Sequence, residues 1–482
     1  MFGDQDDAAA VTDTKWSLVQ SGEARSERRF LSTGALAQGD ARSAARTPHS
    51  REFGDRRSYL VPALEIFGFD VIVNRTNNLF GRTGDYHVTT DTVRRNFRGG
   101  WVTDNDPFSV NQFAHPYQGA MYHGFARSAG LGYWESSAYT FLGSALWEIA
   151  GERTRPSIND QVASGLAGSL LGEPLFRMAS LVLEHGNGAP SWMREIFAGV
   201  ISPPLGLNRL AFGDRFAPVF SSRGAAYYSR LQLGYSGSMR RVQGTPGTEG
   251  DFKRNALIAD FSMQYGLPGK PGYEYTRPFD YFTFDITATT ANMIDTIGTR
   301  GLMAGKPFGE GDDAFRGIWG LYGSYDYIAP QTYRISTTAL SLGTTMQWWL
   351  ARGLALQASA LAGVGYGAVG ALHVTTDKDY HYGVAPQAVL LLRLIFKDKA
   401  ALDLNARDFF VHGISRGNEN IARADVSFTW RVYKNHALAL KYLWNRRDSS
   451  LPILGSRAQT GATLGVFYSY VGREGFSAVD WR

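Results

Sequence analysis

The C-terminal half of the chain alternates apolar and polar residues with a period of two. From Ala422 to Val432 every even-numbered position is apolar, and every odd-numbered position is polar or charged. Similar segments recur between residues 225 and 472, and their apolar face often ends in Tyr or Trp. This pattern indicates antiparallel strands with one apolar and one polar face.

Segment length favours a membrane barrel over a soluble β-sandwich, which is the alternative interpretation. The segments run about ten to sixteen residues, enough to cross a bilayer at a tilt, and bacterial barrels have an even number of strands. Short links such as Asp398-Lys399 and Lys434-Asn435 suit periplasmic turns. We therefore predict a mainly β fold: a transmembrane antiparallel up-and-down β-barrel of about 12 strands, with ten or fourteen left open, and an N-terminal α-helical region.

The predicted domains follow the change of period along the chain. Residues 1–56 are polar and aperiodic and are expected to form a disordered leader. Residues 57–215 place apolar residues three to four apart, which indicates helices. Residues 216–482 form the barrel. Both ends of an even-stranded barrel lie on the periplasmic side, so the helical domain is expected to be periplasmic or to plug the lumen.

Composition excludes several classes of protein. The chain has no cysteine, so thiolate zinc sites, disulfide scaffolds and cysteine nucleophiles are excluded. Its net charge of +5 is a small excess for 482 residues, and we expect no nucleic-acid partner. No long continuous apolar stretch predicts a membrane helix, and no signal peptide is visible at the N-terminus.

Residues suited to chemistry gather in the helical region. Glu148 and Glu152 are four apart and are predicted to share a helix face, where like charges favour general-acid chemistry. Together with His115 and Asp160 they are candidates for an acid/base site. The competing interpretation, which we favour, is a buried polar network with Arg177 that orients the helices. No metal and no other cofactor is expected.

Two further sets of residues have predicted roles. The helix-packing and capping motif consists of Ser157, Asn159, Asp160, Gly168, Gly172 and Glu173. The predicted lumen-facing residues are Arg230, Arg240, Arg393, Asp403, Arg407, Arg423, Asp425 and Arg431. An open lumen with this net positive lining would favour anions, whereas a plugged lumen would pair these residues with the plug.

Five motifs carry a resemblance to a known family. They are Asp104-Asn-Asp-Pro-Phe108, His115-Pro-Tyr-Gln-Gly119, Gly143-Ser-Ala-Leu-Trp-Glu148, Pro156-Ser-Ile-Asn-Asp160 and Gly172-Glu173. With them, residues 59–208 resemble an uncharacterised Gram-negative envelope family, a domain of unknown function that precedes an outer-membrane barrel. The resemblance implies a location in the bacterial outer membrane and no specific activity.

A looser similarity is to VanZ-like membrane proteins. The matching positions are His115, Glu148, Ser157, Asp160, Gly165, Gly168 and Gly172. The predicted helices differ from that family because they are too polar and too short to span a bilayer.

The sequence therefore predicts an outer-membrane barrel with no enzymatic activity. The expected role is a porin-like passage for small or lipidic anionic molecules, or a structural part of the envelope. The alternative is an envelope enzyme that acts on lipid or glycan through His115, Glu148, Glu152 and Asp160. Expected partners are outer-membrane lipid, the barrel-assembly machinery during biogenesis and a periplasmic protein.

Overall fold

The described residues, which begin at position 57, belong to one compact unit. The computed structural model describes residues 57–81, 84–184, 190–243, 250–330, 333–371, 378–413, 417–452, 455–472, 476 and 478–481. The predicted leader, residues 1–56, lies outside this described part.

Twelve antiparallel strands close into a barrel in which β12 pairs with β1. This closure, with helices on the N-terminal side, confirms the predicted fold class. The strands are β1 (Tyr227–Gln243), β2 (Gly250–Tyr265), β3 (Phe282–Thr289), β4 (Thr296–Phe308), β5 (Phe315–Ile328), β6 (Tyr333–Ala351), β7 (Leu354–Ala371), β8 (Tyr380–Phe396), β9 (Ala400–Gly413), β10 (Gly417–Tyr433), β11 (His436–Leu451) and β12 (Gly455–Val471).

Ion pairs across the lumen identify the inner face of the strands. Arg230 of β1 binds Asp403 of β9 at 3.0 Å, although these strands are not neighbours in the sheet. Even-numbered residues of β1 therefore face the lumen. The odd-numbered Leu231, Leu233 and Tyr235 face outward, and each is more than 40% exposed. The outer wall of β1 is thus apolar, as the alternation predicts.

The helical region contains α-helices interrupted by π-helical and 3-10 segments. These elements are α2 (Leu60–Phe80), η2 (Gly84–Tyr86), α3 (Thr90–Arg98), η3 (Val110–Ala114), α4 (His115–Ser128), α5 (Tyr133–Leu146), η4 (Trp147–Gly151), α6 (Ile158–Gln161), η5 (Val162–Ala167), α7 (Gly168–Glu184), α8 (Trp192–Ile201), α9 (Pro203–Phe212) and η6 (Gly213–Arg215). Among the described residues, α6, η5 and α7 form a helical run of 27 residues that is long and apolar enough to cross a membrane. By length and composition alone, the expectation that every helix is too short and too polar does not hold for Ile158–Glu184, although 83% of its most apolar window is buried inside the protein.

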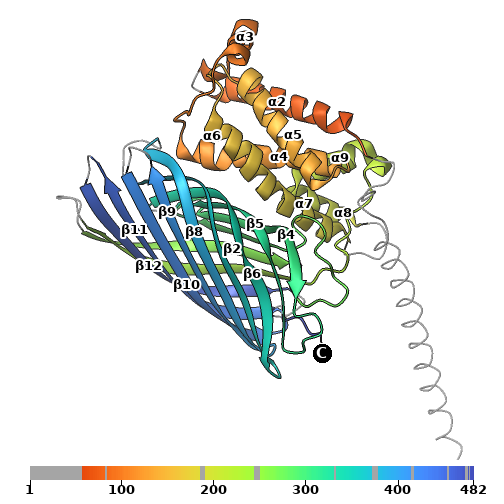
Figure 1. Ribbon diagram of the computed structural model, residues 1–482, viewed down its shortest axis with the longest axis vertical. Helices are drawn as coiled ribbons and strands as arrows, with labels where there is room; N and C mark the ends of the chain where they lie inside the picture. The colour runs from red at the N-terminus through yellow and green to blue at the C-terminus, as the bar shows by residue number, and fades with distance from the viewer. Residues whose placement is uncertain are drawn as a thin grey trace, which may run out of the picture. The chain divides into compact units, whose positions relative to one another are not determined.

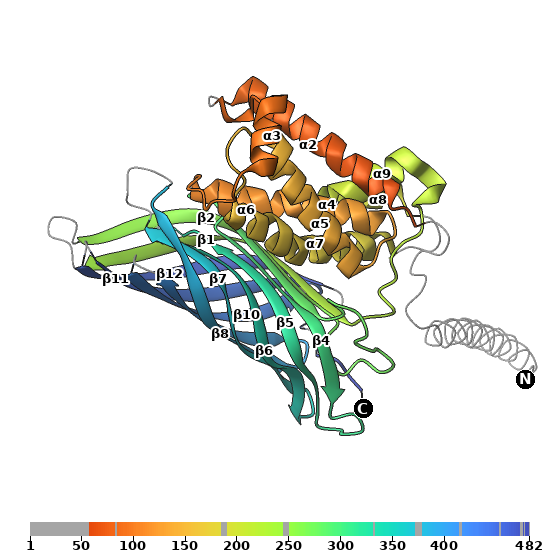
Figure 2. The ribbon, with the colours of Figure 1, turned by 45° about the horizontal axis from the view of Figure 1, so that its top comes forward.

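The helices pack against the outer wall of the barrel and not inside it (Figures 1 and 2). Asp326 of β5 faces the lumen, where Arg407 of β9 binds it at 3.2 Å. The adjacent Tyr325 therefore points outward, and its hydroxyl donates to the Gln112 carbonyl of η3 at 2.6 Å. The rings of Phe108 and outward-facing Tyr380 of β8 also meet edge to face at 5.3 Å. The lumen-plugging alternative is therefore wrong for the described helices.

The helical region contacts the barrel at both ends of its wall. The end with short turns, such as Arg352-Gly353, also holds the start of β1. There the Glu184 carboxylate at the end of α7 accepts from the Ser222 backbone N–H at 3.1 Å. At the opposite end, Asn159 of α6 donates to the Tyr382 hydroxyl near the start of β8 at 2.9 Å. The run Ile158–Glu184 therefore follows the wall from one end towards the other.

Candidate functional site

Three ionisable side chains converge in the helical region, next to the barrel wall. His115 is the first residue of α4, Glu148 lies in η4, and Asp160 lies in α6. One potential ligand atom from each lies within 4.8 Å of the other two. We call these three residues the polar centre. The sequence proposed all three as candidates, and the structure brings them together.

Each member of the polar centre adjoins or lies within a π-helical segment. His115 directly follows η3, Glu148 lies within η4, and Asp160 comes two residues before η5. A π segment widens the helix by one residue per turn and is frequent at functional sites. The three segments rotate these side chains relative to a regular helix, which is why residue spacing does not predict their convergence.

Within the described part of the chain, the contacts of the polar centre leave one oxygen of Glu148 without a hydrogen-bond partner, so this oxygen could exchange a proton. His115 Nε2 lies 3.8 Å from Asp160 Oδ2, and His115 Nδ1 lies 3.3 Å from the Ser164 hydroxyl. Glu148 Oε2 accepts from the Ser157 backbone N–H at 2.8 Å. Among the described residues, Glu148 Oε1 is a buried oxygen with no hydrogen-bond partner.

The polar centre is almost fully removed from solvent. His115 is 5% exposed, and Glu148 and Asp160 are each 3% exposed. Two buried carboxylates this close cannot both stay ionised without a compensating positive charge, which a shared proton, protonated His115 or a bound cation would supply. A substrate reaches these atoms only when the surrounding side chains move.

His115, Glu148 and Asp160 are also the residues that could hold a divalent cation. A His plus carboxylate set suits several divalent metals. Tetrahedral ligands about 2.1 Å from zinc lie about 3.4 Å apart. The 3.8 Å separation of His115 Nε2 and Asp160 Oδ2 is wider, so a cation would require the site to contract.

Glu152 does not lie on the helix face that the sequence predicted it to share with Glu148. The helix ends at Gly151, so Glu148 and Glu152 do not share a regular helix face. Glu152 Oε1 accepts from the Trp147 indole N–H at 2.8 Å, and Oε2 accepts from the Thr154 hydroxyl at 3.0 Å. Burial raises the pKa of the Glu152 carboxyl, and the charge of His115 opposes that rise. Glu152 borders the polar centre as a hydrogen-bonded neighbour.

A hydrogen-bonded shell links the polar centre to the barrel. Asp104 Oδ1 accepts from Asn159 Nδ2 at 2.6 Å and from Asn111 Nδ2 at 2.7 Å. The same two amides donate to the hydroxyls of Tyr382 and Tyr380, at 2.9 and 3.0 Å. These tyrosines were missed at the sequence level, because aromatic residues near a strand end also suit the membrane interface. The only feature of the sequence that could have pointed to these tyrosines is that they flank His381.

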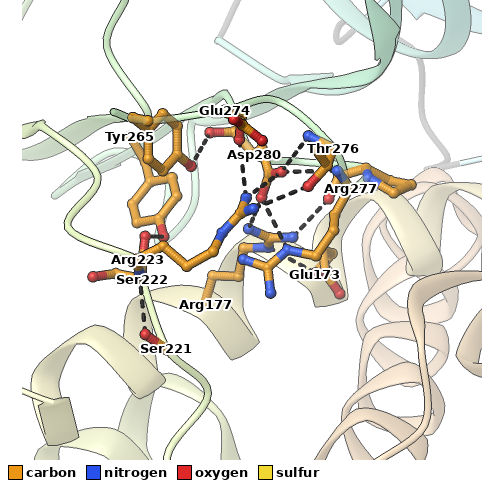
Figure 3. Close-up of polar contacts among 12 residues, drawn as sticks. Glu173, Arg177, Ser221, Ser222, Arg223, Tyr265, Glu274, Thr276, Arg277 and Asp280 are labelled. Carbon is orange, nitrogen blue, oxygen red and sulfur yellow. Dashed lines mark hydrogen bonds and ion pairs between the residues drawn. The ribbon is translucent and has the colours of Figure 1, made fainter. Parts of the chain in front are cut away.

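A second buried network clamps α7 to the segment between β2 and β3, and we call it the arginine clamp. Figure 3 shows Glu173, Arg177, Arg223, Arg277 and Asp280 converging. Arg177 Nε donates to Glu173 Oε1 at 2.7 Å, and Arg177 Nη1 donates to Asp280 Oδ1 at 3.1 Å. Arg223 Nη2 and Arg277 Nε bind the same aspartate at 2.5 and 3.3 Å. Arg177 therefore pairs in this clamp, and the predicted network with Glu148 and Glu152 is wrong.

The charges of the clamp favour an ionised Asp280. Burial alone raises the pKa of its carboxyl, but the cations of Arg177, Arg277 and Arg223 outweigh that effect and hold the pKa below its ordinary value. Glu173 is also surrounded by basic side chains. Its Oε2 lies 2.8 Å from Arg127 Nε and 3.1 Å from His123 Nε2.

The remaining residues of the predicted motif lie at the start of α6 and between α4 and α7. The Ser157 hydroxyl accepts from the Asp160 backbone N–H at 3.2 Å, so Ser157 caps α6. A Cβ added at Gly168 would lie 2.6 Å from the Gly119 Cα, and one at Gly172 would lie 2.9 Å from the His123 Cβ. The two helices approach closely at these glycines.

The predicted lumen residues lie among carboxylates and the C-terminal segment. Arg230 and Arg393 both bind Asp403, at 3.0 and 2.5 Å. Arg407 binds Asp285 of β3 on the far side of the barrel at 3.1 Å. Asn405 donates to Asp425 at 3.0 Å, Arg423 lines a cavity with Lys441, and the Arg431 guanidinium lies over the Phe476 ring at 5.1 Å. The side chain of Arg240 lies outside the described part of the structure.

Two of these pairs cross the lumen, Arg230–Asp403 and Arg407–Asp285, because each joins strands that are not neighbours in the barrel. The C-terminal segment adds a further crossing, because Val479 and the Gln347 side chain of β6 exchange two hydrogen bonds of 2.7 and 2.8 Å. A cavity of about 540 Å³ lies in the barrel, lined by residues that include Lys253, Asp260, Asp295 and Lys441. Arg230, Arg393 and Arg407 bind protein carboxylates, so these three arginines are not available as a ring that attracts anions.

Comparison with known proteins matches part of the helical region to a family. Residues 100–204 match the model of the domain of unknown function DUF3943. The matched segment contains His115, Glu148 and Asp160, and the family description names no activity. No curated protein matches the chain.

Solved structures similar to this chain are outer-membrane channels. The outer membrane channel DcaP of Acinetobacter baumannii is 8% identical, with 52% of this chain and 97% of that chain covered and a TM-score of 0.25. The COG4313 outer membrane channel from Pseudomonas putida F1 is 10% identical, with 52% and 96% covered and a TM-score of 0.27. The anion-selective porin from Comamonas acidovorans is 7% identical, with 51% and 99% covered and a TM-score of 0.23. TM-scores this low do not establish a common fold. The assignment of the fold therefore rests on the strand pairing.

Proposed function

We propose that this chain is an integral protein of the bacterial outer membrane whose polar centre performs acid/base chemistry on a lipid. The observation that carries the proposal is the convergence of His115, Glu148 and Asp160 within 4.8 Å. A closed barrel with an apolar outer wall supports the location, because closure satisfies every strand edge in lipid.

The position of the polar centre supports a lipid as the substrate. The shell around it bonds to Tyr380 and Tyr382, whose side chains are on the outside of the barrel. A molecule that approaches this wall comes from the membrane and not through the lumen. Ionisable groups in such a position are rare and usually functional.

The contacts assign a role to each residue of the centre. His115 accepts the proton of an attacking water or hydroxyl group, and Asp160, 3.8 Å from its Nε2, stabilises the imidazolium that forms. Glu148 in its protonated form donates through its unpartnered Oε1 to the oxygen of the leaving group. The reaction class is hydrolysis or group transfer at the polar part of the lipid.

Mass spectrometry of outer-membrane lipids tests this proposal. A strain deleted for the gene is complemented with the wild type, with His115→Gln, Glu148→Gln or Asp160→Asn, or with the control Asp425→Asn. The control alters a lumen carboxylate remote from the centre. We expect one lipid species to depend on the wild type and the control and to be lost with all three centre variants. Identical lipid profiles in all strains, with each protein folded, would overturn the proposal.

An anion channel is the second candidate, favoured by the cavity of about 540 Å³ with Lys253 and Lys441 in its lining. The cross-lumen pairs oppose it, because a solute would have to displace the Arg230–Asp403 and Arg407–Asp285 contacts.

A further inference from the structure

The helical region has the polarity of a membrane-embedded bundle. Its interior holds charged side chains such as Arg127 and Glu173, each at most 1% exposed. Its surface carries large apolar side chains on several helices: Leu64, Phe67 and Ile72 on α2, Trp134 and Leu142 on α5, and Trp192, Phe197 and Val200 on α8. The interior also contains apolar side chains such as Phe125 and Leu171, but the surface of a water-soluble bundle is polar.

The apolar surface of α2 is continuous over more than three turns. From Leu60 to Ile72, every exposed residue is apolar. Asp70 of the same helix points inward, where its carboxylate accepts from the Tyr122 hydroxyl at 2.5 Å. Isolated apolar residues on a surface are normal, but a face of this extent marks contact with another apolar phase.

The lengths of the helices match the thickness of a bilayer. Helix α2 has 21 residues and is about 30 Å long, close to the hydrocarbon thickness of a membrane. The run Ile158–Glu184 has 27 residues and is long enough to cross a bilayer, but 83% of its most apolar window is buried inside the protein. The apolar surface that is free to meet lipid therefore belongs mainly to α2, α5 and α8.

Charge is concentrated near one end of this surface. Six exposed arginines lie on α3, at the end of α2 and before α6, together with two exposed aspartates, Asp85 and Asp91. The arginines are Arg75, Arg94, Arg95, Arg98, Arg153 and Arg155. Anionic head groups at the membrane surface complement this excess of positive charge.

We infer that the helical region lies within the lipid bilayer beside the barrel, with its exposed apolar faces against acyl chains. The described helices then cover one sector of the barrel wall and take the place of lipid there. This placement does not depend on the proposed chemistry, and its test reports position alone.

Spin labels on single cysteines test the placement, and the chain contains no native cysteine to interfere. Leu64→Cys, Leu142→Cys and Val200→Cys are labelled in the full chain, folded into phosphatidylethanolamine and phosphatidylglycerol vesicles. Leu233→Cys on the outer wall of β1 is the control for lipid, and Ser456→Cys at the start of β12 is the control for water. Electron paramagnetic resonance then measures collision of each label with oxygen, which concentrates in lipid, and with a water-soluble nickel chelate.

We expect the three helix labels to match Leu233→Cys, with oxygen accessibility several-fold above nickel accessibility. Labels that collide with nickel as freely as Ser456→Cys would place the helices in water and overturn the inference. Labels shielded from both reagents would show a protein partner on this face and would also overturn it.

Discussion

At the scale of single residues, the polar centre depends on three side chains whose potential ligand atoms lie within 4.8 Å of one another. His115, Glu148 and Asp160 could be selected because imidazole and carboxyl groups interrupt apolar helix patterns. Their convergence depends on three π-helical segments, which leave no periodic signature in a sequence. Tyr380 and Tyr382 could not be selected, because their partners in the helical region lie more than two hundred residues away in the chain.

The close approach of α4 and α7 gives a prediction at this scale. Gly168→Ala places a Cβ 2.6 Å from the Gly119 Cα, and backbone cannot yield as a flexible side chain does. We expect the free energy of unfolding to fall by about 1–3 kcal/mol. Urea unfolding followed by tryptophan fluorescence measures it.

Gly68→Ala is the matched control, because nothing lies within 4 Å of its added Cβ in the middle of α2. Alanine should leave the stability unchanged or raise it by up to about 1 kcal/mol. Equal effects of the two substitutions would contradict the claim that close helix contact requires Gly168.

At the scale of elements, the strands were predictable and the packing of the helices was not. Alternation identifies a strand such as β10, Gly417–Tyr433, because one face is the apolar outer wall and the other faces the lumen. Helical periodicity identifies an apolar face but does not say whether that face meets a core or lipid. In the sequence, the exposed face of α2 has the same pattern as a face that packs against a core, and no pattern predicts that the helices pack against the outer wall.

The arginine clamp predicts a dependence on pH. Because the pKa of folded Asp280 is below its ordinary value of 3.8, its ion pairs stabilise the fold above that value. This contribution disappears as the pH falls through the lower, folded-state pKa. We expect Asp280→Asn to lower the free energy of unfolding by about 3 kcal/mol at pH 7. The difference from the wild type should shrink once the pH is well below 3.8.

Unfolding in urea at a series of pH values measures this difference. Asp448→Asn, which removes an exposed pair with Arg446, is the control and should leave the free energy of unfolding almost unchanged, because solvent screens this pair. A cost for Asp280→Asn that is independent of pH would show that shape, and not charge, holds the clamp together.

At the scale of the whole molecule, the barrel is a closed scaffold that carries the helices on its outside. Asp403 holds Arg230 of β1 and Arg393 of β8, and Arg407 reaches Asp285 across the barrel. Composition could suggest a net positive lining, but only the fold shows which carboxylates stand opposite those arginines.

Planar bilayers provide a test at this scale. We expect the full chain to give no steady ohmic conductance, because the lumen pairs and the Val479 segment cross the solute path. A porin reconstituted in the same lipid is the positive control, and heat-modifiable gel mobility shows that the barrel is folded. Steady conductance from folded protein would support the channel and contradict the closed lumen.

The polar centre meets a lipid substrate only where the helical region lies in the membrane. Electron cryomicroscopy of the full chain in lipid nanodiscs shows where the helices lie. We predict that α2, α4, α5 and the run Ile158–Glu184 lie inside the disc against the outer wall of the barrel, with acyl-chain density along α2 and α8. Helices outside the disc, below the mouth of the barrel and surrounded by water, would contradict it.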